Sequence, residues 1–454
     1  MISMKFGGTS MGSAENIKKC AEIILKKKNK TPVVVVSAMT CVTDKLLAAE
    51  KAAIEKKIDT MIKICREILD LHFSTIDELI GNNKNSKEAK NFVESEIAGL
   101  ENFLSALSII LEISPASRDK ILAIGEKLSA KILAEFLKSK GEKSEFFNFE
   151  FLCDRKVIKK TNEKKFFDCL RSKIKKTLDP ALKNKTIPIC TGFFGQFPSG
   201  IIAAVGRGYS DFCAAIVGET LKAKKIEIWT DVDGILSADP RIVENPIFLD
   251  EISFAEAAEM ASFGAKVIHP KTIYPAVKEN IPVWIKNTFN PDFPGTLISR
   301  DGKNSNKICK SITAKKNISV ITILSSEMSE KIGFLADVFS IFKKYEIGID
   351  IVATSENSFS ATVEKKISEI KPLLEELTFF GKILTIEDQA IVGAIGNEMG
   401  EKIGTGAKFL ETISKLGINA NIISRDATKN SIFFVVENSQ AEKVIQKIHS
   451  EILE

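Results

Sequence analysis

The chain has 454 residues, of which 44% are hydrophobic and 27% are charged, and its formal net charge is +5 at pH 7. A chain of this length exceeds one hydrophobic core, so we expect a globular protein with several domains. Its apolar runs, such as Pro32–Val36, are strand-sized and exclude a membrane span, and no basic-then-apolar leader opens the chain. We therefore expect a cytoplasmic protein without a membrane partner.

The numbers and positions of the cysteines, histidines and lysines argue against two further classes of protein, those that bind zinc and those that bind nucleic acids. Eight cysteines without a Cys-x-x-Cys pair and three widely separated histidines do not match a zinc site, and we predict no protein metal ligand. The lysines are dispersed among glutamates and no RNA- or DNA-binding module is recognisable. We therefore expect no nucleic-acid partner.

Strand-like and helix-like segments alternate over roughly the first 300 residues, which predicts an α/β sandwich. Short runs rich in Val, Ile and Phe are typical of buried strands in a sheet covered by helices. Strands are predicted at Ile2–Phe6, Pro32–Ala38, Glu145–Phe149, Thr186–Cys190, Lys225–Trp229 and Pro282–Ile285. Helices are predicted at Ser117–Lys138 and Ser210–Leu221, with a helical insertion at about residues 48–114.

Turns rich in glycine or in polar side chains follow four of these strands. They are Gly7-Gly8-Thr9-Ser10, Ser37-Ala38-Met39, Thr191-Gly192-Phe193-Phe194-Gly195 and Thr230-Asp231-Val232-Asp233-Gly234. The first is not a P-loop, because Lys5 precedes the glycines instead of following them. Open α/β sheets bind ligands at the carboxyl ends of their strands, so the convergence of four such turns predicts a site there.

Roughly the last 140 residues contain two βαββ units. Strands are predicted at Ile318–Leu324, Ile347–Thr354 and Phe359–Val363, and again at Ala390–Ile395, Ile418–Ser424 and Ile432–Val436, with helices ending at Tyr345 and Leu416. Gly404 follows Gly333 by 71 residues, and Asn421 follows Asp350 by the same interval. Each unit is too small to bury its own face, so the units should pair with each other or with a second subunit.

A second dense motif is Gly206-Arg207-Gly208-Tyr209-Ser210-Asp211. Ser210 or Asp211 would cap the helix that follows. The Arg207 guanidinium could grip a carboxylate through two parallel hydrogen bonds, and Asp211 could take an ammonium group. An amino acid carries both of these groups, so the motif favours an amino-acid ligand.

Other charged residues are ambiguous when taken alone. Glu126 borders the apolar stripe of its helix and could be a surface residue or a ligand-binding one. Lys5, Lys266 and Arg241 near one sheet edge could neutralise a triphosphate. Phosphoryl transfer depends mainly on such positioning and charge stabilisation.

Together these motifs resemble the aspartate kinases (aspartokinases), specifically the monofunctional, lysine-sensitive type with two C-terminal ACT domains. The resemblance rests on residues 5–10, 206–211, 230–235, 254–260 and 264–270, in this order. It implies an α/β amino-acid-kinase three-layer sandwich with a mainly parallel sheet, followed by two α+β ACT domains. The implied boundaries are 1–298 for the kinase domain, 299–310 for a linker, 311–387 for a first, inserted ACT unit, and 388–454 for a second one completed by residues from about 305–317.

The resemblance implies ATP-dependent phosphorylation of the β-carboxylate of L-aspartate to 4-phospho-L-aspartate, with Mg²⁺ held through the ATP phosphates and water. This step opens lysine, threonine, methionine and diaminopimelate synthesis. The implied catalytic residues are Lys5 and Asp211. The implied substrate contacts are Thr43, Glu126, Phe193, Arg207, Ser210 and Asp211. The implied nucleotide contacts are Lys5, Gly7, Gly8, Thr9, Ser10, Thr230, Asp231, Leu236, Arg241, Lys266 and Val267.

Feedback by an amino acid, L-lysine in the resembling enzymes, is also implied, together with a homodimer through the ACT domains or a tetramer. The implied effector site consists of Met328, Gly348, Ile349, Asp350, Ser355 and Glu356. Two positions depart from the pattern. Leu236 stands where several relatives carry a tyrosine, and Lys331 would repel a bound lysine unless Glu330 or Glu356 compensates.

Two alternatives stay open: another amino-acid kinase of the same fold, such as one acting on glutamate, and a catalytically silent amino-acid sensor. The set of Glu126, Arg207 and Asp211, together with the ACT-like tail, argues against the first. The presence of Lys5 and Asp211 argues against the second.

Overall fold

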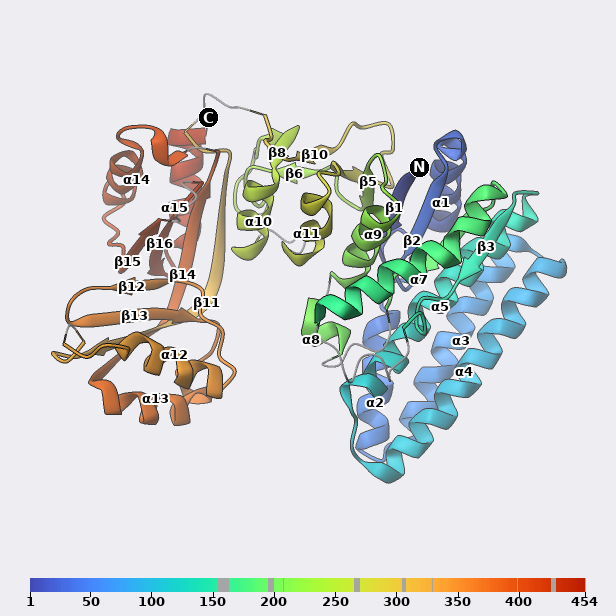
Figure 1. Cartoon of the computed structure of the whole chain (residues 1–454), viewed down its shortest axis with the longest axis horizontal. Coiled ribbons are helices and arrows are strands. Elements are labelled where there is room, and N and C mark those ends of the chain that lie inside the picture. The colour runs from blue at the N-terminus through green and yellow to red at the C-terminus, as the bar shows by residue number, and fades with distance from the viewer. Residues whose placement is uncertain are drawn as a thin grey trace. The chain divides into compact units, whose positions relative to one another are not determined.

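The computed structural model describes residues 1–153, 163–194, 200–206, 208–264, 270–303, 308–328, 330–397, 399–425 and 430–453. The chain divides into two compact units, coloured mainly blue to green and orange to red in Figure 1. The first unit comprises Met1–Ile235, Asp250–Phe254 and Ile268–Gly302. The second comprises Leu236–Leu249, Ala255–Val267 and Lys303–Glu454.

An eight-stranded sheet forms the centre of the first unit. In spatial order its strands are β3 (Ser144–Phe147), β4 (Ile187–Thr191), β2 (Pro32–Val36), β1 (Ile2–Phe6), β5 (Ile226–Thr230), β9 (Val283–Asn287), β10 (Thr296–Ser299) and β8 (Glu251–Ser253). The six strands from β3 to β9 are parallel, and β10 runs antiparallel to β9. Every residue of β1 and β2 is buried, as expected of strands covered on both faces. The predicted α/β class and mainly parallel sheet are confirmed.

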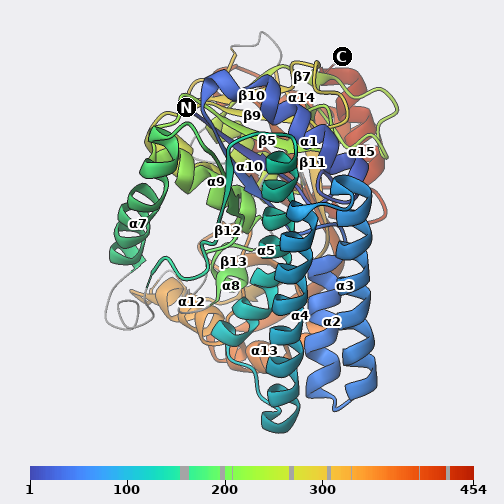
Figure 2. The same ribbon diagram turned by 90° about the vertical axis from the view of Figure 1, so that its right-hand side faces the viewer.

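Helices lie on both faces of this sheet, some packed on the strands and others on those helices. They are α1 (Ala14–Lys26), α2 (Val42–Ile54), α3 (Ile58–Ile80), α4 (Lys84–Ile110), α5 (Pro115–Ser139), α7 (Glu163–Lys183), α8 (Ile201–Val205), α9 (Tyr209–Thr220) and α11 (Pro270–Lys278). Helix α9 packs against β1, β2 and β5, and α5 packs against β2, β3 and β4 from the other side, where α2, α3 and α4 lie beside α5 (Figure 2). None of the described helices is long and apolar enough to cross a membrane.

A six-stranded antiparallel sheet forms the centre of the second unit. In spatial order its strands are β12 (Val352–Thr354), β13 (Ser358–Val363), β11 (Ser311–Leu324), β14 (Lys382–Ile395), β16 (Ser431–Glu437) and β15 (Ile422–Arg425). The order is symmetric, because each repeat contributes three strands and the two longest strands, β11 and β14, pair in the middle. The two repeats thus pair with each other within the chain.

The remaining elements of the second unit are helices and short turns. They are α10 (Phe254–Ser262), α12 (Phe334–Lys344), α13 (Lys371–Leu377), α14 (Thr405–Ser414) and α15 (Ala441–Ile448), with η2 (Ile367–Glu369), η3 (Thr378–Phe380), η4 (Met399–Glu401) and η5 (His449–Leu453). Elsewhere, η1 (Lys28–Lys30) follows α1, and β6 (Ile235–Leu236) pairs with β7 (Phe248–Leu249).

The internal repeat extends to individual backbone conformations. Gly333 and Gly404, which are 71 residues apart, cap α12 and α14 with φ angles of 88° and 82°. Asn317 and Asp388, also 71 residues apart, have φ angles of 60° and 53° next to the register shift between β11 and β14. Asparagine and aspartate tolerate this left-handed conformation better than most residues. The structure therefore confirms the repeat and adds one matched pair to those seen in the sequence.

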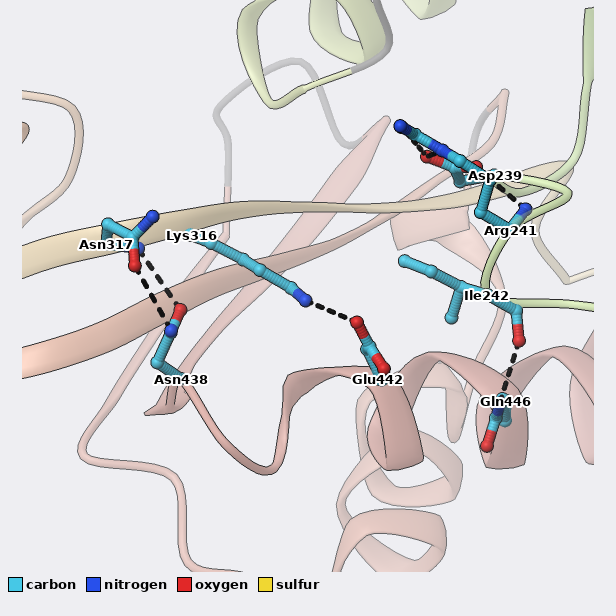
Figure 3. A network of polar contacts seen from close by, with 8 residues as sticks. All are labelled: Asp239, Arg241, Ile242, Lys316, Asn317, Asn438, Glu442 and Gln446. Carbon is cyan, nitrogen blue, oxygen red and sulfur yellow. Dashed lines mark hydrogen bonds and ion pairs between the residues drawn. The ribbon is translucent and has the colours of Figure 1, made fainter.

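Residues 236–249 pack against the second repeat. The Nε2 group of Gln446 on α15 donates a hydrogen bond to the Ile242 carbonyl oxygen at 2.7 Å (Figure 3). The same helix is tied to β11 by an ion pair between Lys316 and Glu442, whose charged atoms lie 2.6 Å apart. Ser237 Oγ lies 2.8 Å from His449 Nε2 in the same unit. The segment that carries Leu236 and Arg241 is thus supported by the C-terminal helix.

Candidate active site

Lys5 and Asp211 form a close ion pair in the first unit. Nζ of Lys5 lies 2.5 Å from Oδ1 of Asp211, and the two side chains are 9% and 14% exposed. Lys5 is the penultimate residue of β1, and Asp211 lies in the first turn of α9, where the helix dipole favours a carboxylate. In this pair, two largely buried charges neutralise each other at the carboxyl end of the sheet. An anionic ligand could compete with Asp211 for the Lys5 ammonium group.

The glycines after β1 keep the space beside Lys5 open. A Cβ on Gly7 would lie 3.5 Å from Lys5 Nζ, and a Cβ on Gly8 would lie 3.3 Å from the Ala38 carbonyl oxygen. Thr40 Oγ1 donates to the Gly8 carbonyl oxygen at 3.0 Å and so holds the turn against the end of β2. The Gly7 N–H already donates to the sheet, so Gly7 offers a ligand space and not a hydrogen bond.

Glu126 is a buried carboxyl group with one oxygen in use. It is 1% exposed and accepts a hydrogen bond from the Tyr209 hydroxyl at Oε1, at 2.7 Å. Its Oε2 is buried and has no hydrogen-bond partner among the described residues. Burial raises the pKa of Glu126 to about 7, while the Tyr209 hydrogen bond, the backbone N–H groups of Glu126 and Ala38, and the Lys5 charge lower it. An unpaired buried oxygen is costly, so it indicates a place for a donor from a ligand.

Three other predicted substrate contacts lie around Tyr209 and its neighbour in the chain. The ring of Phe193 is fully buried and meets Tyr209 edge to face, with ring centroids 5.6 Å apart. Thr43, at the start of α2, hydrogen-bonds to the Tyr209 hydroxyl. Ser210 Oγ lies 2.8 Å from Ser37 Oγ at the end of β2. The structure thus brings these predicted residues together.

Tyr209 itself was not among the predicted contacts, although it lies inside the Gly206–Asp211 motif. Burial raises its pKa well above the usual value, and so does the neighbouring Glu126 carboxylate. The hydroxyl therefore stays protonated and remains a donor to Glu126. Its place between Gly208 and Ser210 at a helix start is the signal that could have identified it.

The predicted nucleotide contacts after β5 lie beside the lysine turn. Trp229 of β5 is in register with Phe6 of β1, so Thr230 and Asp231 follow the strand adjacent to Lys5. Thr230 Oγ1 donates to Asp231 Oδ1 at 3.0 Å. Ser10 Oγ lies 2.8 Å from Thr288 Oγ1, just after β9, while Thr9 is exposed.

The remaining predicted nucleotide contacts belong to the second unit or lie outside the described residues. Leu236 and Arg241 belong to the second unit, where the exposed Arg241 guanidinium binds Asp239 with Nη2 2.5 Å from Oδ2. Arg207, Lys266 and Val267 lie outside the described residues. No group of three or more His, Cys, Asp or Glu side chains that could hold a metal ion occurs in the described ranges.

In the predicted effector site, Asp350 already has a cationic partner. Lys315 Nζ lies 2.7 Å from Asp350 Oδ1, and the same lysine contacts Glu364. Burial raises the pKa of Asp350, and Lys315 lowers it. Asp350 Oδ2 is buried without a hydrogen-bond partner in the described part of the chain. Half of this carboxylate is therefore engaged within the protein itself.

The other predicted effector residues lie around the first repeat. Met328 and Ile349 pack against its core, Ser355 Oγ lies 2.7 Å from Ser358 Oγ, and Gly348 and Glu356 are exposed. Lys331 lies 3.7 Å from Asp337 and over the rings of Phe379 and Phe380. The carboxylate facing Lys331 is thus Asp337, where the sequence suggested Glu330 or Glu356.

Comparisons with known proteins identify relatives along the whole chain. The amino acid kinase family model matches residues 2–287, and an ACT domain model matches residues 392–452. Aspartokinase 1, chloroplastic, from Arabidopsis thaliana is 34% identical over 465 residues, which cover 99% of this chain and 80% of the relative. Lysine-sensitive aspartokinase 3 from Escherichia coli K12 is 32% identical, with 100% of this chain and 99% of the relative covered.

A solved structure shows the same fold over the whole chain. The crystal structure of E. coli aspartokinase III in complex with aspartate and ADP (R-state) matches with a TM-score of 0.82 and 29% identity, and covers 100% of both chains. The predicted kinase fold and the predicted ACT architecture are confirmed by these matches. The chain belongs to the aspartokinase family.

Proposed function

We propose that this chain is an aspartate kinase that transfers the γ-phosphoryl group of ATP to the β-carboxylate of L-aspartate, giving 4-phospho-L-aspartate and ADP. This reaction is the first step towards lysine, threonine, methionine and diaminopimelate. The observation that carries the proposal is the grouping of Lys5, Asp211 and Glu126 at the carboxyl ends of parallel strands. Family membership supports it, since a related E. coli enzyme was solved with aspartate and ADP.

The phosphate side of the proposed reaction depends on charge and position. The ammonium of Lys5 stabilises the charge of the transferring phosphoryl group, and Asp211 holds that ammonium in place. Gly7 and Gly8 leave room for phosphate oxygens beside it. Mg²⁺ would be held by the ATP phosphates and by water, and would neutralise part of the phosphate charge.

The aspartate side explains the buried acid. Oε2 of Glu126 accepts a hydrogen bond from the α-ammonium group of aspartate, while Tyr209 fixes the carboxylate from its other oxygen. Arg207 binds the α-carboxylate of the substrate. Phe193 closes the pocket with Thr43 and Ser210. The β-carboxylate is ionised at neutral pH and attacks phosphorus without a general base.

For regulation we propose L-lysine as the effector, bound by Met328, Gly348, Ile349, Asp350, Ser355 and Glu356. The name of the lysine-sensitive E. coli relative supports this choice. The effector's ammonium has to displace Lys315 from Asp350 or bind the second carboxylate oxygen. We also propose a cytoplasmic homodimer through the ACT domains, with a tetramer as the alternative.

The deciding experiment measures ADP release with Mg²⁺ and ATP, offering L-aspartate or L-glutamate, each with and without millimolar lysine or threonine. We expect turnover with aspartate alone and suppression by lysine. Turnover with glutamate would favour another amino-acid kinase. No turnover with either amino acid would favour the sensor.

Substitution of Arg207 tests the substrate assignment. R207A should raise the KM for aspartate by about a hundredfold, because a charge-assisted bidentate contact is lost, and should leave the KM for ATP nearly unchanged. K19A is the matched control, since Lys19 forms an exposed helical pair with Glu15. An unchanged aspartate KM in R207A would remove Arg207 from the site.

A further inference from the structure

We infer that Asp119 is a positioning residue for the aspartate pocket, because it fastens the short helix α8 that precedes Tyr209, Ser210 and Asp211. The inference rests on the proposed function, since it assigns Asp119 a part in aspartate binding. Asp119 lies outside every motif that carries the family resemblance. Its place in the structure is what identifies it.

Asp119 caps a helix from a distance. It lies near the start of α5, is 3% exposed, and accepts the Ile201 N–H with Oδ1 at 3.0 Å and Oδ2 at 3.1 Å. Ile201 is the first residue of α8, whose N-cap position is Gly200 and has no side-chain cap. The first N–H groups of a helix lack partners within the helix. Asp119 supplies the acceptor that a serine or aspartate N-cap would supply locally.

Helix α8 needs such an external contact. It has five residues, fewer than an isolated helix needs to be stable. It is bounded by Gly200 and Gly206, with φ angles of 82° and 87°, a backbone region that glycine enters readily. A Cβ on Gly200 would lie 3.1 Å from Pro115 Cβ and 3.4 Å from Asp119 Oδ1. The glycine thus lets α8 approach α5, and the Asp119 contact fixes it there.

One helix then holds both ends of the segment 201–209. Asp119 and Glu126 are seven residues apart on α5, so they lie on the same face and about 10 Å apart along the axis. Asp119 binds the Ile201 N–H, and Glu126 binds the Tyr209 hydroxyl. Ser210 and Asp211 follow directly. Loss of the Asp119 contact would release one end of the segment that presents these pocket residues.

Asp119 is ionised at neutral pH although its burial disfavours the charged form. Burial raises the pKa of Asp119 to about 6, and the Ile201 N–H lowers it. The group is therefore still mostly ionised at neutral pH, where its hydrogen bond is charge-assisted and stronger than a neutral one. The same charge contributes to the raised pKa of Tyr209 and so helps to keep that hydroxyl a donor to Glu126.

The test compares D119N with a neighbouring buried acid. Glu50 is 4% exposed and binds Arg118, the residue before Asp119 on α5, with 2.6 Å between Arg118 Nη2 and Glu50 Oε1. E50Q therefore removes an equally buried charge beside the same helix without removing an acceptor from Ile201. We expect D119N to raise the aspartate KM about tenfold, with the ATP KM within about twofold of wild type, and E50Q to leave both unchanged.

Several outcomes overturn the inference. An equal rise of the aspartate KM in D119N and E50Q would assign Asp119 a general structural role, and so would a fall in kcat with both KM values unchanged. Should D119N not fold, D119E carries the carboxylate one methylene further and should raise the aspartate KM by a smaller factor. An unchanged aspartate KM in D119E would also overturn the inference.

Hydrogen–deuterium exchange separates this inference from the proposed function. In D119N, but not in E50Q, the amides of residues 201–206 should exchange faster than in wild type. Unchanged exchange overturns the inference even if the wild type phosphorylates aspartate. If the wild type shows no aspartate turnover, the proposed function fails, and faster exchange in D119N would still support the anchoring of α8 by Asp119.

Discussion

The two units treat their buried acids differently. In the first unit, Glu126 leaves Oε2 buried and unpaired among the described residues, and Lys5 meets Asp211 where parallel strands end. In the second unit, Asp350 has already taken Lys315 as a partner. Each acid keeps one buried, unpaired oxygen among the described residues, but the other oxygen of Glu126 accepts from a neutral hydroxyl, whereas that of Asp350 pairs with a lysine whose charge opposes a cationic ligand. A substrate class can therefore be inferred more directly than an effector.

Removing Lys5 should have the largest effect. K5A is expected to lower kcat by about a thousandfold, because it removes a cation from the transferring phosphoryl group. ADP release at saturating aspartate measures this loss. K19A should retain wild-type turnover, because the Lys19–Glu15 pair is exposed. Turnover of K5A near that of K19A would mean that Lys5 is not part of the catalytic site.

Neutralising Glu126 should impair binding and stabilise the free protein. E126Q is expected to raise the aspartate KM by about a hundredfold, because the acceptor for the ammonium loses its charge. Initial rates at varied aspartate concentration measure it. An aspartate KM within twofold of wild type would show that Glu126 does not bind the substrate.

The stability of E126Q should depend on pH. Burial raises the pKa of Glu126 from 4.5 to about 7, so the wild type loses stability as the pH rises from about 4.5 through about 7, where the unfolded state has released a proton that the folded state still binds. E126Q avoids this cost, which is up to about 3 kcal/mol. Its thermal midpoint should exceed that of the wild type at about pH 8.5 and match it near pH 4.5. A midpoint difference that does not change with pH would show that Glu126 is not the group responsible.

Removing the partner of Asp350 within the protein should make inhibition by lysine more sensitive. K315M is expected to lower the lysine concentration for half-inhibition by about tenfold, because Asp350 becomes fully available to the effector's ammonium. D350A should relax inhibition without changing uninhibited turnover, since effector and substrate sites are coupled through a conformational equilibrium. K316M is the control, because Lys316 pairs with Glu442 instead. K316M should give the wild-type inhibition curve. Curves of K315M and D350A that also superimpose on wild type would remove Asp350 from the effector site.

The smallest effects test the symmetry of the repeats. G333A and G404A should each lose about 1 kcal/mol of stability, because alanine is strained at the positive φ of both caps and no other atom obstructs it. The two losses should agree within error in chemical denaturation. G99A, inside α4, should gain up to about 1 kcal/mol, because its helical backbone suits alanine. Unequal losses would show that the repeats have diverged in how they support their helices.

Much of the fold was predictable because buried strands are short apolar runs. β1 begins and ends where predicted, and β4, β5 and β9 are displaced by one or two residues. The strands β11 and β14 are longer than predicted. The additional residues Ser311–Lys315 of β11 pair with Ile391–Ile395, and the additional residues Lys382–Ile386 of β14 pair with Val320–Leu324, without a continuous apolar pattern of their own. The local pattern of apolar residues indicates which strands are buried. It does not show which distant strands pair with each other.

The site was partly predictable for a related reason. Motifs at strand ends and helix starts identified Lys5, Ser210 and Asp211, which depend on local geometry. The Lys315–Asp350 pair and the Asp119–Ile201 contact join residues 35 and 82 positions apart, and no local pattern records either. The matched bulge residues Asn317 and Asp388 could have been found, because both residue types tolerate a left-handed backbone and lie one repeat apart.

The central pairing of β11 and β14 makes the two repeats inseparable. β11 pairs with β14 through Ser311–Lys315 and again through Val320–Leu324. Removal of either strand would therefore leave the backbone groups of the other unpaired along most of its length. A chain truncated after β13 would expose that edge to other molecules, and an unpaired strand edge invites aggregation. Deleting the second repeat would therefore yield an insoluble protein, and an enzyme freed from feedback has to be sought through point substitutions.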